Sequence, residues 1–506
     1  MAERDPFRPG WLYWLAFAAA LAVRLAWLGI RPLHHDEGVN AWFLNSLLQF
    51  RGYRYNPDAF HGPFLYLIGC LPGWILGVGT IALRLPVALT SAGTILLLLP
   101  LRRRLGRAGM TGSAWLMALS PSLVFYGRDL IHETYLVFLS LALVAAGSHW
   151  LETRRRRDLL LAVAALALLF TVKETTPLTL AGLGLATLTL GSPKEWRALW
   201  PGRREALLAA AVFGAIYVLF FTTLFSNPMG LVDSVRAYLP WAEKGVEGGT
   251  GHEKPWTYFP ELLQAFEATT VLCALGGGVL AFRRRNAEET DPTDEMTRFG
   301  RFCAVWAASQ AVAYSLIPYK TPWLILNMIV PAALTAGVLF REAAARSLSL
   351  AARGALAAVL AVGLGWSAWR AADLSFRRYD DASLGLVYAD TNRQVWDLLA
   401  FVRAAARRAP HPADVSLAAF FTGRWPLPWY LRDFTHSQWD RKVEKLPTED
   451  IILADPQQEA SLQPLLARGY RHRQFLLRQG VFVAVWVRPG LWPGGTVETV
   501  APHSGA

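Results

Sequence analysis

FLYLIGCLPGWILG, at residues 64–77, decides how the rest of this chain is threaded through a membrane. If the segment spans a bilayer, every later loop changes sides; if it lies along one surface, every later loop keeps its side. Pro72 and the glycines at 69 and 73 interrupt a segment that is already short, which is typical of an interfacial helix rather than a span. We therefore predict that 64–77 lies along the outer membrane surface.

The arginine-rich loops decide between the two alternatives. Loops on the cytoplasmic side of a membrane carry an excess of Arg and Lys. If 64–77 lies on the surface, all the arginine runs fall inside; if it spans, all of them fall outside. The surface placement is therefore predicted, with a cytoplasmic N-terminus. The runs lie at 102–104, 154–157, 203–204 and 283–285, and at Arg341 with Arg346.

The composition indicates a polytopic membrane protein. The 506 residues are 53% hydrophobic and only 17% charged, with a mean hydropathy of +0.27, which is too apolar for a soluble chain. The net charge of +12 does not indicate nucleic-acid binding, because the arginines lie in short runs between apolar segments. Cys70, Cys273 and Cys303 lie in apolar stretches without metal-ligand spacing, which favours neither a disulfide nor a metal site.

A bilayer-length window predicts a mainly α fold with about eleven transmembrane helices. Residues 11–30 are interpreted as an uncleaved anchor, because no small-residue cleavage site follows them. The predicted spans are 11–30, 82–101, 112–127, 134–151, 158–173, 176–191, 205–225, 259–282, 300–317, 322–340 and 351–370.

The predicted topology divides the chain into a transmembrane domain at 1–370, with its first outer loop at 31–81, and an extracytoplasmic domain at 371–506. The second domain has an α/β pattern. Helices are predicted in 391–408 and 459–469, and strands in 415–420, 450–455 and 481–487.

The first outer loop carries HHDEGVNAWF, in which two carboxylates follow two histidines. A carboxylate held near the headgroups and partly desolvated is suited to act as a general base, and an adjacent one would orient it or hold a metal. We predict catalytic roles for Asp36 and Glu37. The alternative is that Asp36 caps the following helix. His34 and His35 are candidate metal ligands or simply polar loop residues.

A second acidic cluster, RDLIHE, lies at the predicted outer ends of two spans. Spacings of three and four would put Asp129, His132 and Glu133 on one helical face. We predict a catalytic role for Asp129 and substrate contacts for Arg128 and Glu133. The alternative for Arg128 is a purely structural ion pair with Asp129 or Asp36.

Three further cationic positions are predicted at outer ends of spans. His61, in HGP, lies where the chain re-enters the membrane, and would meet a lipid phosphate or serve as an interfacial histidine. Lys173, in VKETTP, and Lys320, between two prolines in PYKTPW, are suited to hold a phosphate as point charges. The alternative for both lysines is ordinary snorkelling.

These motifs, in this order, resemble the GT-C membrane glycosyltransferases, in particular the protein O-mannosyltransferases and the aminoarabinose transferases. The matching segments are DE in the first outer loop, HGP, RLP at 84–86, SPSLVFYGRDLIHET and YKTPWLILNMIVP. HHDEGVNAWF, YKTPW and WPLPWYLRD of the C-terminal region most resemble the family described as flippase activity-associated and linked to protein N-glycosylation.

The resemblance implies transfer of a sugar from a polyprenyl-phosphate carrier to an acceptor hydroxyl on the extracytoplasmic face, with inversion at the anomeric carbon. It implies Asp36 as base, Asp129 as a second acid and Lys320 as a phosphate ligand. The relatives often have a lysine or histidine before two prolines, and His61-Gly62-Pro63 departs from that pattern. Some of these enzymes need a divalent metal, so the metal requirement stays open, as does a glycan, lipid or protein acceptor.

The main alternative is a membrane protein that binds lipid-linked sugars, or assists a flippase, without catalysis. Transporters carry polar residues or broken helices at mid-membrane in matching halves. Here the acids lie at the outer ends of spans whose interiors are apolar, which favours an enzyme. A scaffold with a partner-binding tail would explain WPLPWYLRD, but it would leave the acids unexplained.

Overall fold

The computed structural model describes residues 7–49, 54–56, 61–190, 200–246, 251–283, 292–347, 349–421, 423–442, 447–466 and 469–494. The chain divides into two compact units. Unit 1 consists of Met1–Leu28 with Ser46–Arg377, and unit 2 of Gly29–Asn45 with Arg378–Ala506. The segment that carries Asp36 therefore belongs to the same unit as the C-terminal region.

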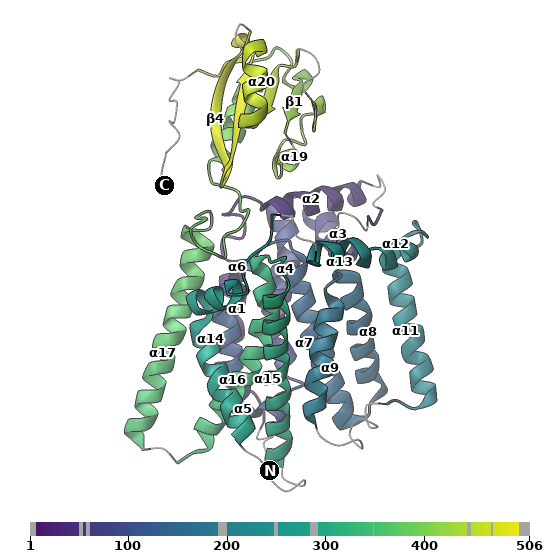
Figure 1. The fold of residues 1–506 in the computed structure, drawn as a ribbon, viewed down its shortest axis with the longest axis vertical. Coiled ribbons are helices and arrows are strands. Elements are labelled where there is room, and N and C mark those ends of the chain that lie inside the picture. The colour runs from purple at the N-terminus through teal and green to yellow at the C-terminus, as the bar shows by residue number, and fades with distance from the viewer. Residues whose placement is uncertain are drawn as a thin grey trace. The chain divides into compact units, whose positions relative to one another are not determined.

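Unit 1 is a helical bundle whose long helices run side by side (Figure 1). Its helices are α1 (Trp11–Leu25), α3 (Phe64–Leu76), α4 (Thr80–Gly93) with the 3-10 turn η1 (Thr94–Leu98), α5 (Arg102–Leu119), α6 (Pro121–Tyr126), α7 (His132–Thr153), α8 (Arg156–Val172), α9 (Thr176–Thr187), α11 (Arg203–Phe221), α12 (Gly230–Arg236), α13 (Tyr238–Val246), α14 (Tyr258–Arg283), α15 (Pro292–Leu316), η3 (Pro322–Ile325), α16 (Leu326–Ala345) and α17 (Leu350–Ala372). The helix α2 (His35–Leu48) begins in unit 2 and ends in unit 1.

Each predicted span contains a helix, and within the described residues six helices are long and apolar enough to cross a membrane by length and composition. The total of eleven stays a prediction. The six are Thr80–Leu98, His132–Thr153, Arg203–Phe221, Tyr258–Arg283, Pro322–Ala345 and Leu350–Arg377.

The helix α3 has 13 residues, with Pro72 inside it. At 1.5 Å per residue it is about 20 Å long, which is shorter than the roughly 30 Å of a bilayer core. The helices Trp11–Leu25 and Thr176–Leu190 belong to the same class of shorter apolar helices, so the interfacial role of 64–77 stays a prediction that rests on Pro72 and the arginine runs.

The predicted span at 112–127 is not continuous, because α5 ends at Leu119 and α6 begins at Pro121. Ser120 caps the new helix, with its hydroxyl accepting from the Leu123 N–H at 3.2 Å, and proline suits the first position of a helix. Glu267 of α14 accepts hydrogen bonds from the Ser120 hydroxyl at 2.6 Å and from the Ser122 N–H at 2.9 Å. This buried carboxylate holds the start of α6 in place.

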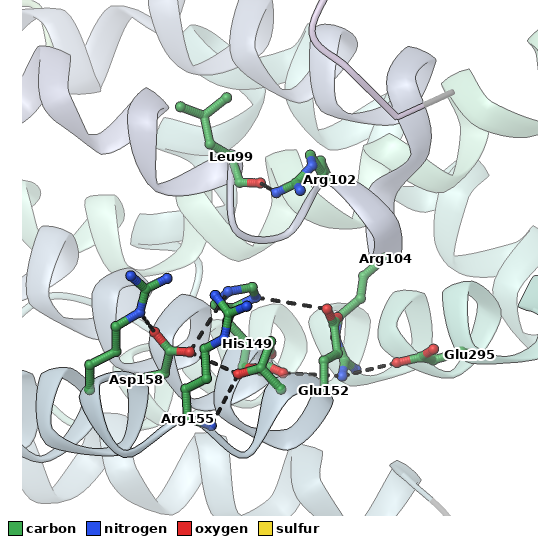
Figure 2. A network of polar contacts seen from close by, with 11 residues as sticks. Leu99, Arg102, Arg104, His149, Glu152, Arg155, Asp158 and Glu295 are labelled. Carbon is green, nitrogen blue, oxygen red and sulfur yellow. Dashed lines mark hydrogen bonds and ion pairs between the residues drawn. The ribbon is translucent and has the colours of Figure 1, made fainter. Parts of the chain in front are cut away.

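A network of polar contacts joins the ends of α5, α7, α8 and α15 (Figure 2). Arg104 contacts Glu152 at 3.1 Å and Glu295 at 3.0 Å, and the His149 ring lies 3.8 Å from both Glu152 and Asp158. Figure 2 shows Arg102, Arg104 and Arg155, which belong to two of the arginine runs that the sequence predicts on the cytoplasmic side.

The C-terminal part of unit 2 is an α/β domain. Its mixed sheet has the order β2-β1-β3-β5-β4, with β1 parallel to β2 and β3, and β5 antiparallel to β3 and β4. The strands are β1 (Leu417–Phe420), β2 (Ser437–Gln438), β3 (Ile451–Ala454), β4 (Arg471–Arg478) and β5 (Val481–Val487), and the main helices are α18 (Val395–Ala406), α19 (Leu427–Tyr430) and α20 (Pro456–Leu466).

The core of this domain forms between α20 and the sheet. Apolar side chains of β1, β3 and β5 pack with Leu462 and Leu466 of α20. The two helices and three strands predicted in the tail are confirmed. The edge strand β4 was not predicted, because its first four residues, Arg-His-Arg-Gln, lack the apolar alternation of a strand.

Candidate functional site

Two hydrogen bonds made by His34 close the N-terminus of α2. The Glu37 carboxylate accepts from the His34 N–H at 2.8 Å, and His34 Nδ1 accepts from the Asp36 N–H at 3.0 Å. The Glu37 bond is one half of a capping box, whereas His34 accepts from the residue two positions later rather than from Glu37. His34 and Glu37 therefore contribute capping bonds at the start of α2, and a capping role of the Asp36 side chain stays an alternative.

The segment before α2 is tied to the C-terminal domain within unit 2. The Leu33 N–H donates to the Tyr430 hydroxyl at 2.7 Å, and the Thr391 hydroxyl donates to the Leu33 carbonyl at 2.7 Å. His34 Nε2 hydrogen-bonds to the Tyr388 carbonyl at 2.7 Å. These bonds fix the backbone immediately before Asp36.

A close approach at Gly38 fixes the first turn of α2. A Cβ placed on Gly38 would lie 2.6 Å from Pro426 Cβ, so only glycine fits there. Trp42 and Trp425 pack edge to face, with ring centroids 6.1 Å apart. The WPLPW segment of the tail is thus part of the packing around Asp36.

Several charged groups surround His35 and Asp36 in unit 2. Burial lowers the pKa of His35 to about 4, the Asp36 carboxylate acts in the opposite direction, and Arg478 and Arg424 add to the lowering. His35 is therefore neutral at physiological pH. Of the tail's cationic groups, Arg478 interacts electrostatically with Asp36, which opposes the lowering of the Arg478 pKa by burial.

The two ring nitrogens of His34 already have hydrogen-bond partners, the Asp36 N–H and the Tyr388 carbonyl. Across the residues that the structure describes, no group of three or more His, Cys, Asp or Glu side chains is placed to hold a metal ion.

Unit 1 contains a buried ion pair at the N-terminus of α7. The Lys173 ammonium, just after α8, donates to both oxygens of the Glu133 carboxylate, each at 2.8 Å. His132 lies beside this pair, close enough for the Lys173 charge to act on its ring. The structure thus joins two motifs that are forty residues apart in the chain.

His61 belongs to the same cluster. Its Nδ1 contacts the Glu174 carboxylate at 2.8 Å, and its ring stacks on Trp241 of α13 with centroids 4.7 Å apart. The His132 ring lies edge-on at 5.0 Å. Burial and the Glu174 carboxylate raise the pKa of Tyr55, whose hydroxyl donates to that carboxylate at 3.2 Å.

The close approach of Gly62 to α8 brings His61 to this place. The Gly62 N–H donates to the Val172 carbonyl at 3.1 Å, and a Cβ on Gly62 would lie 2.1 Å from the Thr171 carbonyl oxygen. A side chain at this position would push the loop away from the end of α8. Glycine in HGP is therefore required by packing.

Arg128 caps the C-terminus of α1. Its guanidinium donates to the carbonyls of Val23, Ala26 and Trp27 at 2.8, 2.7 and 3.0 Å. A guanidinium satisfies helix-terminal carbonyls well. The structure shows this capping role, whereas a substrate contact by Arg128 stays a prediction.

Asp129 lies in the turn between α6 and α7, and is 3% exposed. The prediction that Asp129, His132 and Glu133 share one helical face is wrong, because α7 begins only at His132. Ile131 is extended, with φ −126° and ψ 156°, so the helical spacing does not extend back to Asp129.

Lys320 is buried in the turn before η3. Its ammonium donates to the carbonyls of Lys254 at 3.0 Å and Ile317 at 2.5 Å, and burial lowers its pKa. An ammonium carries three N–H groups, so these two bonds leave one N–H for another acceptor. The position is compatible with the predicted phosphate contact, which stays a prediction.

Sequence reasoning left several participants out of the candidate site. Glu174 was noted in VKETTP but not included, although its carboxylate binds His61. Tyr55, Trp241 and Arg478 lack any local signal, because their roles come from residues far away in the chain. For Glu174, the signal in the sequence was its position next to Lys173, which was predicted to be functional.

No protein-family model matches the sequence, and no curated protein matches it. Solved structures match it through their fold. ArnT from Cupriavidus metallidurans bound to undecaprenyl phosphate aligns over 95% of this chain and 99% of its own, with a TM-score of 0.66 and 17% identity. Its apo state aligns over 95% and 98%, with a TM-score of 0.65 and 17% identity.

The arabinofuranosyltransferase AftD from Mycobacteria aligns over 96% of this chain and 40% of its own length, with a TM-score of 0.53 and 16% identity. Identities this low establish a common fold and leave the activity to be argued from the site. The chain therefore shares its fold with ArnT along nearly the whole length of both proteins, and with part of AftD.

Proposed function

We propose that this protein is a membrane glycosyltransferase that moves a sugar from a polyprenyl-phosphate carrier to an acceptor hydroxyl on the extracytoplasmic face, with Asp36 as general base. The observation that carries the proposal is the position of Asp36 in the first turn of α2, where His34 and Glu37 make the helix cap. The shared fold supports it, since ArnT has been crystallised with undecaprenyl phosphate bound.

The reaction needs little more than positioning and charge. Asp36 accepts the proton of the acceptor hydroxyl as the acceptor oxygen bonds to the anomeric carbon. The bond from that carbon to the phosphate oxygen breaks on the opposite face, and its electron pair leaves with the polyprenyl phosphate. The product is inverted at the anomeric carbon. Nearby positive charge stabilises the departing phosphate.

Unit 1 offers the groups that we propose to contact the carrier phosphate. Lys320 has one N–H beyond its two carbonyl bonds, and His61 becomes a cation when protonated beside Glu174. Lys173 is neutralised by Glu133, so we propose that this pair shapes the binding region rather than adding net charge. Asp129 is proposed as a second acid that organises the site.

The roles of individual residues, the nearer family, the donor sugar and the acceptor are also proposals. Glu37 and Arg128 have capping roles, and any catalytic or substrate contact by them would be additional. The nearer likeness to the flippase activity-associated family linked to protein N-glycosylation is supported by HHDEGVNAWF, YKTPW and WPLPWYLRD. A mannose donor is one candidate within that likeness. A glycan, lipid or protein would serve as acceptor.

The test is transfer of radiolabelled sugar from purified polyprenyl-phosphate donors to a membrane acceptor fraction. Asp36→Asn should reduce kcat/KM by orders of magnitude, because an amide accepts no proton from the acceptor. Asp397→Asn is the matched control, since Asp397 is an exposed aspartate in the first turn of α18. It should transfer at the wild-type rate.

Equal transfer by the wild type and Asp36→Asn would refute the base assignment. Saturable binding of a polyprenyl-phosphate sugar with no transfer to any acceptor would instead favour the non-catalytic reading, in which the protein binds lipid-linked sugars or assists a flippase.

A further inference from the structure

Two segments of the C-terminal domain hold the residues around Asp36. The first, 388–391, binds His34 through the Tyr388 carbonyl and Leu33 through the Thr391 hydroxyl. The second, 425–430, packs Pro426 against Gly38. All of these contacts lie inside unit 2. The segment that carries Asp36 is therefore held in place by residues of the C-terminal domain.

Arg478, at the end of β4, connects these two segments. Its backbone pairs with Thr391 in an antiparallel bridge, and its guanidinium donates to the Trp425 carbonyl at 2.8 Å. Because Arg478 bonds to both 388–391 and 425–430, its side chain is held in a defined position.

The geometry places the Arg478 guanidinium beside the Asp36 segment, because it binds the Trp425 carbonyl and the next residue, Pro426, abuts Gly38. Burial lowers the pKa of Arg478, and the Asp36 carboxylate opposes that lowering. The neighbouring residue His35 experiences the charges of Asp36, Arg478, His34 and Arg424, so Arg424 of the tail and His34 of the same segment are the other ionisable groups in this region. Glu37 is occupied in the helix cap, and Arg424 is paired with Asp440.

We infer that the C-terminal domain supplies a positioning residue for the proposed reaction, with Arg478 keeping the Asp36 carboxylate ionised and directed. This inference rests on the proposed function, because it assigns Arg478 a role through Asp36. A base must be ionised before it can accept a proton, and partial burial favours the protonated carboxyl. A cation near the carboxyl favours its ionised form and so opposes the effect of burial. Because the strand already holds the cation in place, little rearrangement is needed.

The test uses the full-length protein and compares Arg478→Gln with Arg478→Lys. In Arg478→Gln the acid limb of kcat/KM against pH should move to higher pH by about one unit or more, because the cation that favours the carboxylate is lost. Arg478→Lys keeps the charge and should stay near the wild-type profile. A purely structural role for Arg478 would lower the rate at every pH without moving the limb.

Arg471→Gln is the matched control. Arg471 is an exposed arginine at the other end of β4, about 23 Å from Arg478 along the strand at 3.3 Å per residue. It removes the same charge from the same strand and should leave the profile unchanged.

A readout independent of turnover separates this inference from the proposed function. Carbodiimide labelling of Asp36 as a function of pH, measured by peptide mass spectrometry, reports its protonation directly. A labelling midpoint that rises in Arg478→Gln and not in Arg471→Gln supports the inference. An unchanged midpoint overturns it, even if the wild type transfers sugar. A raised midpoint in a protein that transfers no sugar supports the link between Arg478 and Asp36 and counts against the proposed function.

Discussion

Lys173 donates to both carboxylate oxygens of Glu133 at 2.8 Å, and the two side chains are only 7% and 2% exposed. A pair so deeply buried has no water to replace a missing partner. Removing either charge alone leaves the other uncompensated, which costs more than the pair itself contributes to stability.

We expect Lys173→Met to lower the free energy of unfolding by about 3–5 kcal/mol. The double variant Lys173→Met/Glu133→Gln should cost less than the sum of the two single variants, because no buried charge remains. Denaturant unfolding in detergent of all four proteins gives the coupling energy. Additive costs would show that the two residues do not act as a pair.

The exposed pair Arg378–Asp381 is the control for this measurement, with side chains 44% and 35% exposed. Arg378→Gln should cost less than about 1 kcal/mol, since water screens the charge that is left.

The Lys173→Met variant also tests whether the Lys173–Glu133 pair contributes to donor binding. An unchanged donor KM in a folded Lys173→Met protein would argue against any such contribution.

Gly62→Ala should separate His61 from Glu174. The added Cβ would lie 2.1 Å from the Thr171 carbonyl oxygen, so the HGP loop must shift. Overpacking of this kind typically costs about 1–3 kcal/mol. Unfolding of the variant in detergent measures this cost, and its donor KM should rise if His61 contacts the carrier phosphate.

Gly147→Ala in α7 is the matched control, because a Cβ there meets nothing within 4 Å. It should be neutral or stabilise by about 0.5–1 kcal/mol, since alanine loses less entropy in a helix. Similar stabilities for the Gly62 and Gly147 variants would contradict the required close approach at Gly62.

Acid should destabilise the protein through His35. Its pKa is lowered to about 4 by burial in the native state, against about 6.5 in the unfolded chain. Between those values the unfolded state binds more protons, so the contribution of His35 to stability is present above pH 6.5 and is lost as the pH falls towards 4.

The apparent Tm measured from pH 7 to pH 4 reports this loss. His35→Gln has no titrating ring, so its Tm should depend less steeply on pH over that range. His411→Gln, at an exposed histidine of the C-terminal domain, is the control and should keep the wild-type slope. Parallel curves for the wild type and His35→Gln would show that His35 is not the group that titrates.

Glu37 offers a test that separates capping from catalysis. Its carboxylate accepts from the His34 N–H at 2.8 Å, and a glutamine side-chain oxygen can accept the same bond. Glu37→Gln should therefore keep wild-type stability and transfer, whereas Glu37→Ala should lose about 1 kcal/mol and part of the activity. Loss of transfer in Glu37→Gln at unchanged Tm would instead support the predicted catalytic role of Glu37.

Much of the bundle was predictable because long apolar helices are recognisable from the hydropathy of a short stretch of sequence. Each predicted span contains a helix, and the arginine runs between spans follow from composition alone. Breaks were harder to predict. The start of α6 at Pro121 depends on a proline next to a capping serine, and the position of Asp129 depends on the extended backbone at Ile131. A hydropathy window averages over many residues, so it detects neither the helix start at Pro121 nor the extended backbone at Ile131.

Sequence reasoning selected candidate residues, whose roles stay predictions, but not the contacts that they make. Asp36, Glu133, Lys173 and His61 were found because charged side chains at the ends of apolar spans are conspicuous. Their partners were not, since Glu133 meets Lys173 across forty residues and His34 meets Tyr388 across more than three hundred.

The sequence by itself determined the class of protein, the positions of the helices and the residue types available for chemistry, because hydropathy, helix breaks and charge are local properties of the chain. The tertiary structure decided which of those residues act together. It made His34 and Glu37 the cap of α2 and turned Arg128 into the cap of α1. It also joined the Asp36 segment to the C-terminal domain. Hydrogen bonds and close packing between distant segments depend on the folded path of the backbone, which no local pattern encodes.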